Sequence, residues 1–180
     1  MSVTINGSAG VTTNSGAVYN GISSGTVVPY SSFTATTYND FLNIPTWVKR
    51  ITIMLTGIKT SSSGIPIIQL GTSGGIQNTG YLSAASYVKV SSGVTVNGTT
   101  GFPTTGANAT ADLRNGTFVL TLLDAATGTW SCFGVSGTSN DTQTGWCGGS
   151  KVLSGTLDRV RFTTTSTDTF TAGSLNILYE

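Results

Sequence analysis

Apolar and polar residues alternate with a period of two in several short segments, which is typical of β-strands with one buried face. The clearest case runs from 47 to 55, where Lys49, Ile51, Ile53 and Leu55 alternate with Val48, Arg50, Thr52 and Met54. Further strands are predicted at 65–70, 117–123, 129–135, 157–163 and 174–179. We predict an all-β fold of elements about six to nine residues long, arranged as an antiparallel two-sheet sandwich or jelly-roll-like single domain.

Turn residues predict one hairpin in particular. Asp124–Gly128 is a five-residue loop with glycine near its close, and it lies between two predicted strands, so 117–135 is expected to fold back on itself. Arg114, Asn115 and Gly116 read as the turn that precedes this hairpin.

Two segments resist a strand assignment. Met1–Pro29 is rich in Gly, Ser, Thr and Asn, and is either a flexible arm or an ordered segment laid on a partner. Ser91–Ala111 is either a long functional loop or two or three short edge strands joined by glycine turns. We therefore divide the chain into an arm for attachment or oligomerisation, 1–30, and a β-sandwich, 31–180.

The amino-acid composition argues against several classes of function. Charged residues make up 8% of the 180-residue chain, against about 25% in an average soluble domain. There are 22 Ser, 33 Thr and 24 Gly, and we expect them in turns and on outward strand faces. A net charge of +1 argues against nucleic-acid binding, so Lys49–Arg50 is read as a solvated strand face or a subunit contact. No apolar run is long enough for membrane insertion, and the first sixteen residues do not read as a secretion signal.

Histidine is absent, which excludes catalytic arrangements and metal sites that depend on it. The six aspartates lie far apart in sequence, so an enzyme would have to assemble its acids from scattered positions. We expect no catalytic residue, no cofactor and no metal. Cys132 and Cys147 would come together if the intervening segment bends back as a hairpin. Without a secretion signal they are read as free, half-buried thiols.

Sugar-binding proteins stack the apolar face of a sugar on Trp or Tyr and bind its hydroxyls with Asp, Asn and Gln. The segment 139–146 holds these residue types together, in Asn140, Asp141, Gln143 and Trp146. Tyr81, which closes a second Gln- and Asn-containing segment, is a weaker candidate. The alternative for Asn140 and Asp141 is ordinary turn chemistry, in which their side chains bond nearby backbone.

The other two tryptophans are interpreted as core residues and not as sugar contacts. Trp47 and Trp130 both fall within predicted strands, and we expect them in the core.

Three stretches resemble a domain common at the C-terminal end of bacteriophage and prophage tail-fibre proteins, whose members carry the segment I-P-S-W-V-K-R-I-T. This chain has I-P-T-W-V-K-R-I-T at 44–52. It also agrees with that pattern between Gln69 and Tyr81, and from Thr156 to Glu180. With the hairpin around Asp124, the resemblance covers roughly residues 33 to 180.

The resemblance implies a non-enzymatic virion protein, a tail-fibre or tail-tip adhesin that binds bacterial surface polysaccharide. The implied location is the virion tail, after synthesis in the host cytoplasm. Family members usually end a long fibre, whereas little more than thirty residues precede the domain here, so Met1–Pro29 is expected to dock on other virion proteins. Because repeated copies raise avidity, we expect a homo-oligomer, a trimer first. The alternative is a structural virion component, such as a capsid decoration, head fibre or tail-tip scaffold, that binds no receptor.

Overall fold

The computed structural model describes residues 3–6, 10–13, 18–19, 23–24 and 36–180, and this part of the chain contains strands but no helix. In chain order the strands are β1 (Val3–Asn6), β2 (Gly10–Thr13), β3 (Val18–Tyr19), β4 (Ser23–Ser24), β5 (Tyr38–Phe41), β6 (Arg50–Thr60), β7 (Pro66–Thr72), β8 (Gly75–Gln77), β9 (Tyr81–Lys89), β10 (Ser92–Gly98), β11 (Phe102–Pro103), β12 (Arg114–Asp124), β13 (Thr129–Thr138), β14 (Gln143–Val152), β15 (Arg159–Thr164) and β16 (Phe170–Tyr179).

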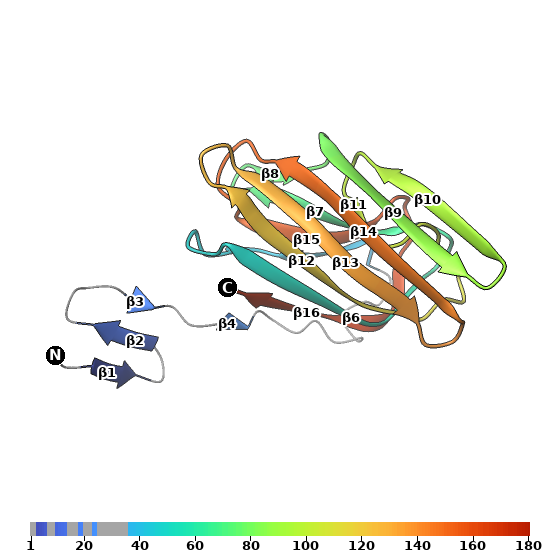
Figure 1. Cartoon of the computed structure of the whole chain (residues 1–180), viewed down its shortest axis with the longest axis horizontal. Coiled ribbons are helices and arrows are strands. Elements are labelled where there is room, and N and C mark those ends of the chain that lie inside the picture. The colour runs from blue at the N-terminus through green and yellow to red at the C-terminus, as the bar shows by residue number, and fades with distance from the viewer. Residues whose placement is uncertain (1–2, 7–9, 14–17, 20–22, 25–35) are drawn as a thin grey trace.

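Two antiparallel sheets lie face to face (Figure 1). The larger sheet has the order β10-β9-β14-β13-β12-β6-β16-β4. The smaller one has the order β11-β7-β15-β5, with β8 paired to β7. The prediction of an all-β, two-sheet sandwich is confirmed.

The core lies between the sheets and follows the predicted alternation. On β6, Ile51, Ile53 and Leu55 are buried, while Arg50 and Thr52 point outward. Trp130, on β13, is buried as expected. Trp47 lies in a turn before β6 and is only partly buried against the same core.

β6 and β12 are longer than predicted, because Gly57 and Asn115, which are residue types that usually end strands, lie at an irregularity in their pairing. β6 and β12 each have 11 residues. Gly57 takes a positive φ of 61° within β6, and Asn115 Oδ1 accepts a hydrogen bond from its N–H at 2.9 Å. The pairing register of β12 with β6 shifts between Arg114 and Gly116. The predicted turn at 114–116 is therefore wrong: β12 continues through these residues, and the bulge lies on β6, where Thr56 and Gly57 stand opposite Asn115.

The hairpin 117–135 is confirmed as β12 and β13, which pair from Arg114↔Thr138 to Asp124↔Thr129. For Ser91–Ala111, the interpretation as edge strands is confirmed in its first half. β10 pairs with β9 at the edge of the larger sheet, and β11 pairs with β7 at the edge of the smaller one.

Glycine is not confined to turns and outward faces, so that expectation is wrong for part of the set. Gly134 and Gly149 lie within β13 and β14 and face the interior. A Cβ at Gly134 would collide with the Phe118 ring and lie 2.6 Å from Thr117 O. Missing side chains at these positions give large neighbouring side chains the space to pack.

Cys132 and Cys147 lie on the paired strands β13 and β14, where Cys132 is opposite Gly149 and Cys147 is opposite Gly134. Both are free, as predicted, but they are fully buried and not half-buried. The hydrogen bond with Cys147, together with burial, raises the pKa of Cys132 well above its ordinary value.

The predicted arm, 1–30, lies largely outside the described residues. Of its described parts, β1, β2 and β3 form a small antiparallel sheet, and β4 pairs with β16 through Ser24↔Leu178 and Ser23↔Tyr179. The role of Met1–Pro29 in attachment stays a prediction.

Candidate functional site

The loop between β13 and β14 holds three of the polar residues proposed as sugar ligands. Asn140 Oδ1 accepts a hydrogen bond from Leu113 N at 3.0 Å, and Asn140 Nδ2 donates to Ala111 O at 2.6 Å. Gln143 Nε2 donates to Asp112 Oδ1 at 3.2 Å. These bonds join the loop to the segment that leads into β12. They occupy groups that a sugar would need. Because Leu113 and Ala111 lie 27 and 29 residues before Asn140, its bonds are contacts between segments and not the local turn chemistry of the alternative interpretation.

Asp141, the third polar residue proposed as a sugar ligand, forms an ion pair with Lys89 of β9. The hydrogen bond from Lys89 lowers the pKa of Asp141 and raises the pKa of Lys89. Asp141 Oδ1 also accepts a hydrogen bond from Thr142 N at 2.7 Å. Solvent reaches both side chains and screens their charges. The ion pair therefore holds the loop in place but contributes little to the free energy of unfolding.

Tyr81 does not belong to a sugar site, which corrects the sequence-based candidate. Its side chain is only 2% exposed, and its ring packs edge-on against Phe102 with centroids 5.0 Å apart. The hydroxyl donates to Gln77 O at 2.9 Å and accepts from Leu70 N at 2.7 Å. A ring enclosed in this way has no face on which a sugar can stack. The backbone bonds instead give Tyr81 a role in joining β9 to β7.

Trp146 lies elsewhere, on the outer face of the larger sheet. Along β14, buried and exposed residues alternate, and Trp146 points away from the core with 46% of its surface exposed. It therefore points away from the interior side where Gln143 meets Asp112. The structure brings Asn140, Asp141 and Gln143 together at the tip of the hairpin and separates Trp146 and Tyr81 from them.

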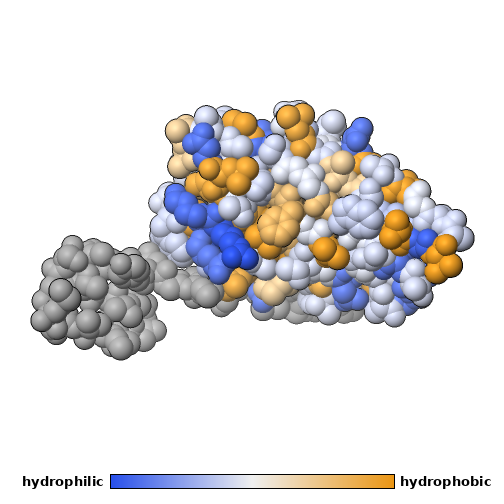
Figure 2. All heavy atoms as spheres, in the orientation of Figure 1, coloured by the Kyte–Doolittle hydropathy of each residue, from blue (hydrophilic) through white to orange (hydrophobic). Residues whose placement is uncertain are grey.

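Two rows of paired residues cross the centre of this outer face and form what we call the platform. They are Ser86, Trp146, Val135 and Thr117 in one row, and Ala84, Gly148 and Phe133 in the other, which ends at the buried Val119. Phe133 is 56% exposed and Val135 is 60% exposed. Neither row contains a charged residue. In Figure 2, which views this face, pale and orange side chains occupy the middle and blue ones gather toward the ends.

The platform combines flat apolar surface with hydroxyl groups. A Cβ at Gly148 would meet nothing within 4 Å, so the surface beside Phe133 is open. Ser86 Oγ lies 2.8 Å from Thr95 Oγ1 of β10, which extends the hydroxyl-bearing surface toward the sheet edge. Rigid aromatic rings with small hydroxyl residues around them are a combination that binding surfaces use.

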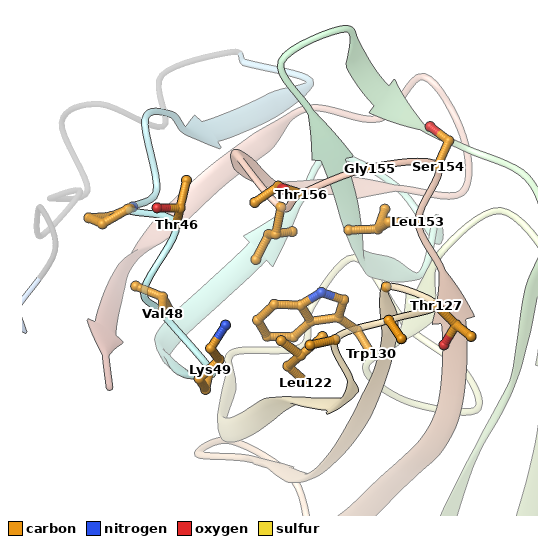
Figure 3. Close-up of a pocket in the computed structure, with 15 residues that line it drawn as sticks. Thr46, Val48, Lys49, Leu122, Thr127, Trp130, Leu153, Ser154, Gly155 and Thr156 are labelled. Carbon is orange, nitrogen blue, oxygen red and sulfur yellow. The ribbon is translucent and has the colours of Figure 1, made fainter.

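A pocket of about 390 Å³ lies at one end of the sandwich, between the segment before β6, the loop from β12 to β13 and the segment after β14. Figure 3 shows the indole of Trp130 at its centre, Val48 and Lys49 on the left, and Leu153 and Thr156 above the ring. A pocket of this size suits a small ligand, since small-molecule sites usually measure about 300–1,000 Å³.

The sequence predicts Trp146 as a candidate sugar contact, but it predicts neither the neighbours of Trp146 on the platform nor the lining of the pocket. The alternation within 129–135 placed Phe133 and Val135 together on one side of a strand, but only the pairing of β13 with β14 shows that they flank Trp146. The pocket combines three segments far apart in the chain, so no local motif could reveal it.

Among the described residues, no group of three or more His, Cys, Asp or Glu side chains is arranged to hold a metal ion. No helix in this part of the chain is long and apolar enough to cross a membrane. No protein-family model matches the sequence, and no curated protein matches it.

Proposed function

We propose that the protein is a non-enzymatic bacteriophage virion protein, a tail-fibre or tail-tip adhesin that binds glycan on the host surface. The observation that carries the proposal is the platform, on which Trp146 and Phe133 are exposed at diagonal positions of neighbouring strands without a charged residue in either row. The resemblance of 44–52 to tail-fibre domains supplies the biological setting.

The chemistry of sugars supports this assignment. A pyranose ring has an apolar C–H face, which an exposed indole covers, and hydroxyls around its rim, which Ser and Thr hydroxyls bind. Exposed apolar patches on soluble proteins commonly mark binding surfaces. The platform spans β9, β14, β13 and β12, and this extent suits an extended polysaccharide that crosses several strands. We extend the proposal to a homo-oligomer, a trimer first, because several weak sites on one particle bind a repeating polymer with high avidity.

A second candidate is a structural virion component without receptor binding, and the same surface favours it. An exposed aromatic patch with aliphatic neighbours is also what a protein–protein contact requires. If the platform packs against another virion subunit, Trp146 is covered on the particle. Binding to bacteria then does not depend on it.

The test is binding of purified full-length protein to a panel of whole bacteria and to their extracted surface polysaccharides. We expect labelling of at least one strain, and a loss of about tenfold for Trp146→Ala and for Phe133→Ala, since ring stacking contributes on the order of 1–2 kcal/mol. Leu82→Ala is the matched control. Leu82 is 78% exposed on the same face but lies outside the platform.

Two outcomes count against the adhesin. One is absence of binding to every strain, with unchanged phage adsorption when the protein is removed from the particle. The other is dissociation of an oligomer by Trp146→Ala in light scattering with full retention of binding to cells. The second outcome assigns the platform to subunit contact and favours the structural candidate.

A further inference from the structure

The pocket around Trp130 has hydrogen-bond donors that have no acceptor among the described residues. Trp130 is 3% exposed, yet its indole N–H has no acceptor among the described residues, and this nitrogen is not enclosed away from solvent. Figure 3 shows the nitrogen on the edge of the ring that faces Leu153 and Thr156. A buried ring that directs its only polar group into a hollow needs an acceptor there, which is either water or a ligand.

A positive charge stands beside the same ring. Lys49 lines the pocket, and none of the salt bridges of the described residues includes it. Its neighbour Arg50, by contrast, is paired with Glu180. No acidic side chain lines the pocket. Asp124 and Asp158 flank the lining segments, but they bond Thr127 and Arg159. Lys49 therefore leaves the pocket with a net positive charge.

Hydroxyl groups and aliphatic surface complete the lining. Thr46, Ser154 and Thr156 provide hydroxyls, and those of Thr46 and Thr156 have no hydrogen-bond partner among the described residues. Ser154 Oγ accepts from Gln77 Nε2, which leaves its own O–H to donate. The remaining wall is aliphatic, from Pro45, Val48, Leu122, Leu153 and Leu157. A ligand that fits offers acceptors on one side and C–H surface on the other.

We propose that this pocket binds a sugar unit that carries a carboxylate, of the uronic acid type. One lysine and one indole N–H match a single negative charge. Phosphate carries more charge, and a single lysine with one indole N–H leaves much of that charge uncompensated. The hydroxyls fit the sugar rim, and the aliphatic wall fits the C–H face. The volume of about 390 Å³ admits a monosaccharide with part of its neighbour.

This site is separate from the platform. Trp130 and Trp146 lie on the paired strands β13 and β14, but Trp130 points into the sandwich and Trp146 points out of it. Trp130 pairs with Lys151, five positions along β14 from Trp146. A negative result at the platform therefore does not contradict the proposal for the pocket, and a negative result at the pocket does not contradict the proposal for the platform.

The experiment titrates ¹⁵N-labelled full-length protein with sodium glucuronate, glucose and inorganic phosphate at constant ionic strength, and follows the indole N–H resonances. Trp146→Phe and Trp47→Phe assign these signals by removing one at a time. We expect glucuronate to shift the Trp130 signal and to leave the Trp146 signal in place, with glucose and phosphate at least tenfold weaker.

Lys49→Met keeps the aliphatic stem and removes the charge, and we expect it to weaken glucuronate binding at least tenfold. Lys59→Met, a lysine of β6 outside the pocket, is the matched control and should bind like the wild type. Lys49 is exposed, so we expect its replacement to leave the fold intact. Melting temperatures verify the folding of both variants. Equal binding of glucose or phosphate, an unchanged affinity in Lys49→Met, or no shift of the Trp130 signal overturns the proposal.

Discussion

Replacing Arg114 with methionine removes a cation that has almost no contact with solvent. The Arg114 side chain is 1% exposed and that of Asp112 is 10% exposed, and Arg114 Nη2 lies 2.8 Å from Asp112 Oδ2. The same nitrogen donates to Ala107 O at 3.3 Å and to Asn108 Oδ1 at 3.2 Å. Arg114 thus fixes the irregular segment before β12 against the end of the sandwich. Burial lowers the pKa of Arg114, but arginine stays charged at any ordinary pH.

The cost of this change comes mainly from the partner left behind. Removing one member of a buried ion pair leaves an uncompensated charge and costs about 3–5 kcal/mol. In a chain of 180 residues this corresponds to a melting temperature lower by about 6 to 20 °C. Arg114→Met combined with Asp112→Asn removes both charges. The double variant should be more stable than the sum of the single changes predicts, by about 0.5 to 3 kcal/mol.

Urea unfolding of the wild type, both single variants and the double variant measures these free energies, and calorimetry supplies the melting temperatures. Arg50→Met is the control, because the Arg50–Glu180 pair is on the surface and should contribute at most about 1 kcal/mol. A loss below about 1 kcal/mol for Arg114→Met, or strictly additive effects in the double variant, would refute the reasoning that a buried charge dominates here.

Three further predictions concern the core. Gly134→Ala should lower the free energy of unfolding by about 1–3 kcal/mol through overpacking, whereas Gly148→Ala, which meets nothing within 4 Å, should stay within about 0.5 kcal/mol in the same urea assay. Tyr81→Phe should cost about 1–3 kcal/mol, because a buried backbone N–H loses its acceptor. Burial raises the pKa of Tyr81, so the folded state holds this proton more tightly than the unfolded state. Stability should therefore fall as the pH rises above about 10, with a shallower fall in Tyr81→Phe. Burial of Cys132 and Cys147 predicts that a thiol reagent modifies either only as fast as the chain unfolds, and the raised pKa of Cys132 lowers its reactivity further. Rapid labelling of the native protein would contradict their burial.

The sandwich could be predicted because β-strands show their faces locally. Ile51, Ile53 and Leu55 alternate with polar residues, and that pattern requires one buried side whatever the partner strand is. The ends of the strands were harder to predict from the sequence. Gly57 and Gly116 look like strand breakers in sequence. Only the pairing of β6 with β12 shows that Gly57 fits into a bulge and that Gly116 is an ordinary strand residue opposite Leu55.

The candidate site was predictable only in part, because a surface residue carries little information about its neighbours. Trp146 was a candidate because an indole next to Asn, Asp and Gln is a combination that sugar-binding proteins use. Its neighbours Phe133 and Val135 depend on the pairing register of two strands. Tyr81 misled because the sequence around it resembles a polar loop, whereas its ring fills the interior beside Phe102. Trp130 was correctly placed in the core, but nothing local shows that its N–H opens into a pocket.

The central claim is that the protein binds host glycan through the platform. The most direct measurement is the affinity of purified wild-type protein and Trp146→Ala for surface polysaccharide extracted from a bacterium that the wild type labels. We predict a dissociation constant raised about tenfold or more in Trp146→Ala, with unchanged melting temperature and oligomeric state. Equal affinities of the two proteins for that polysaccharide would contradict the claim.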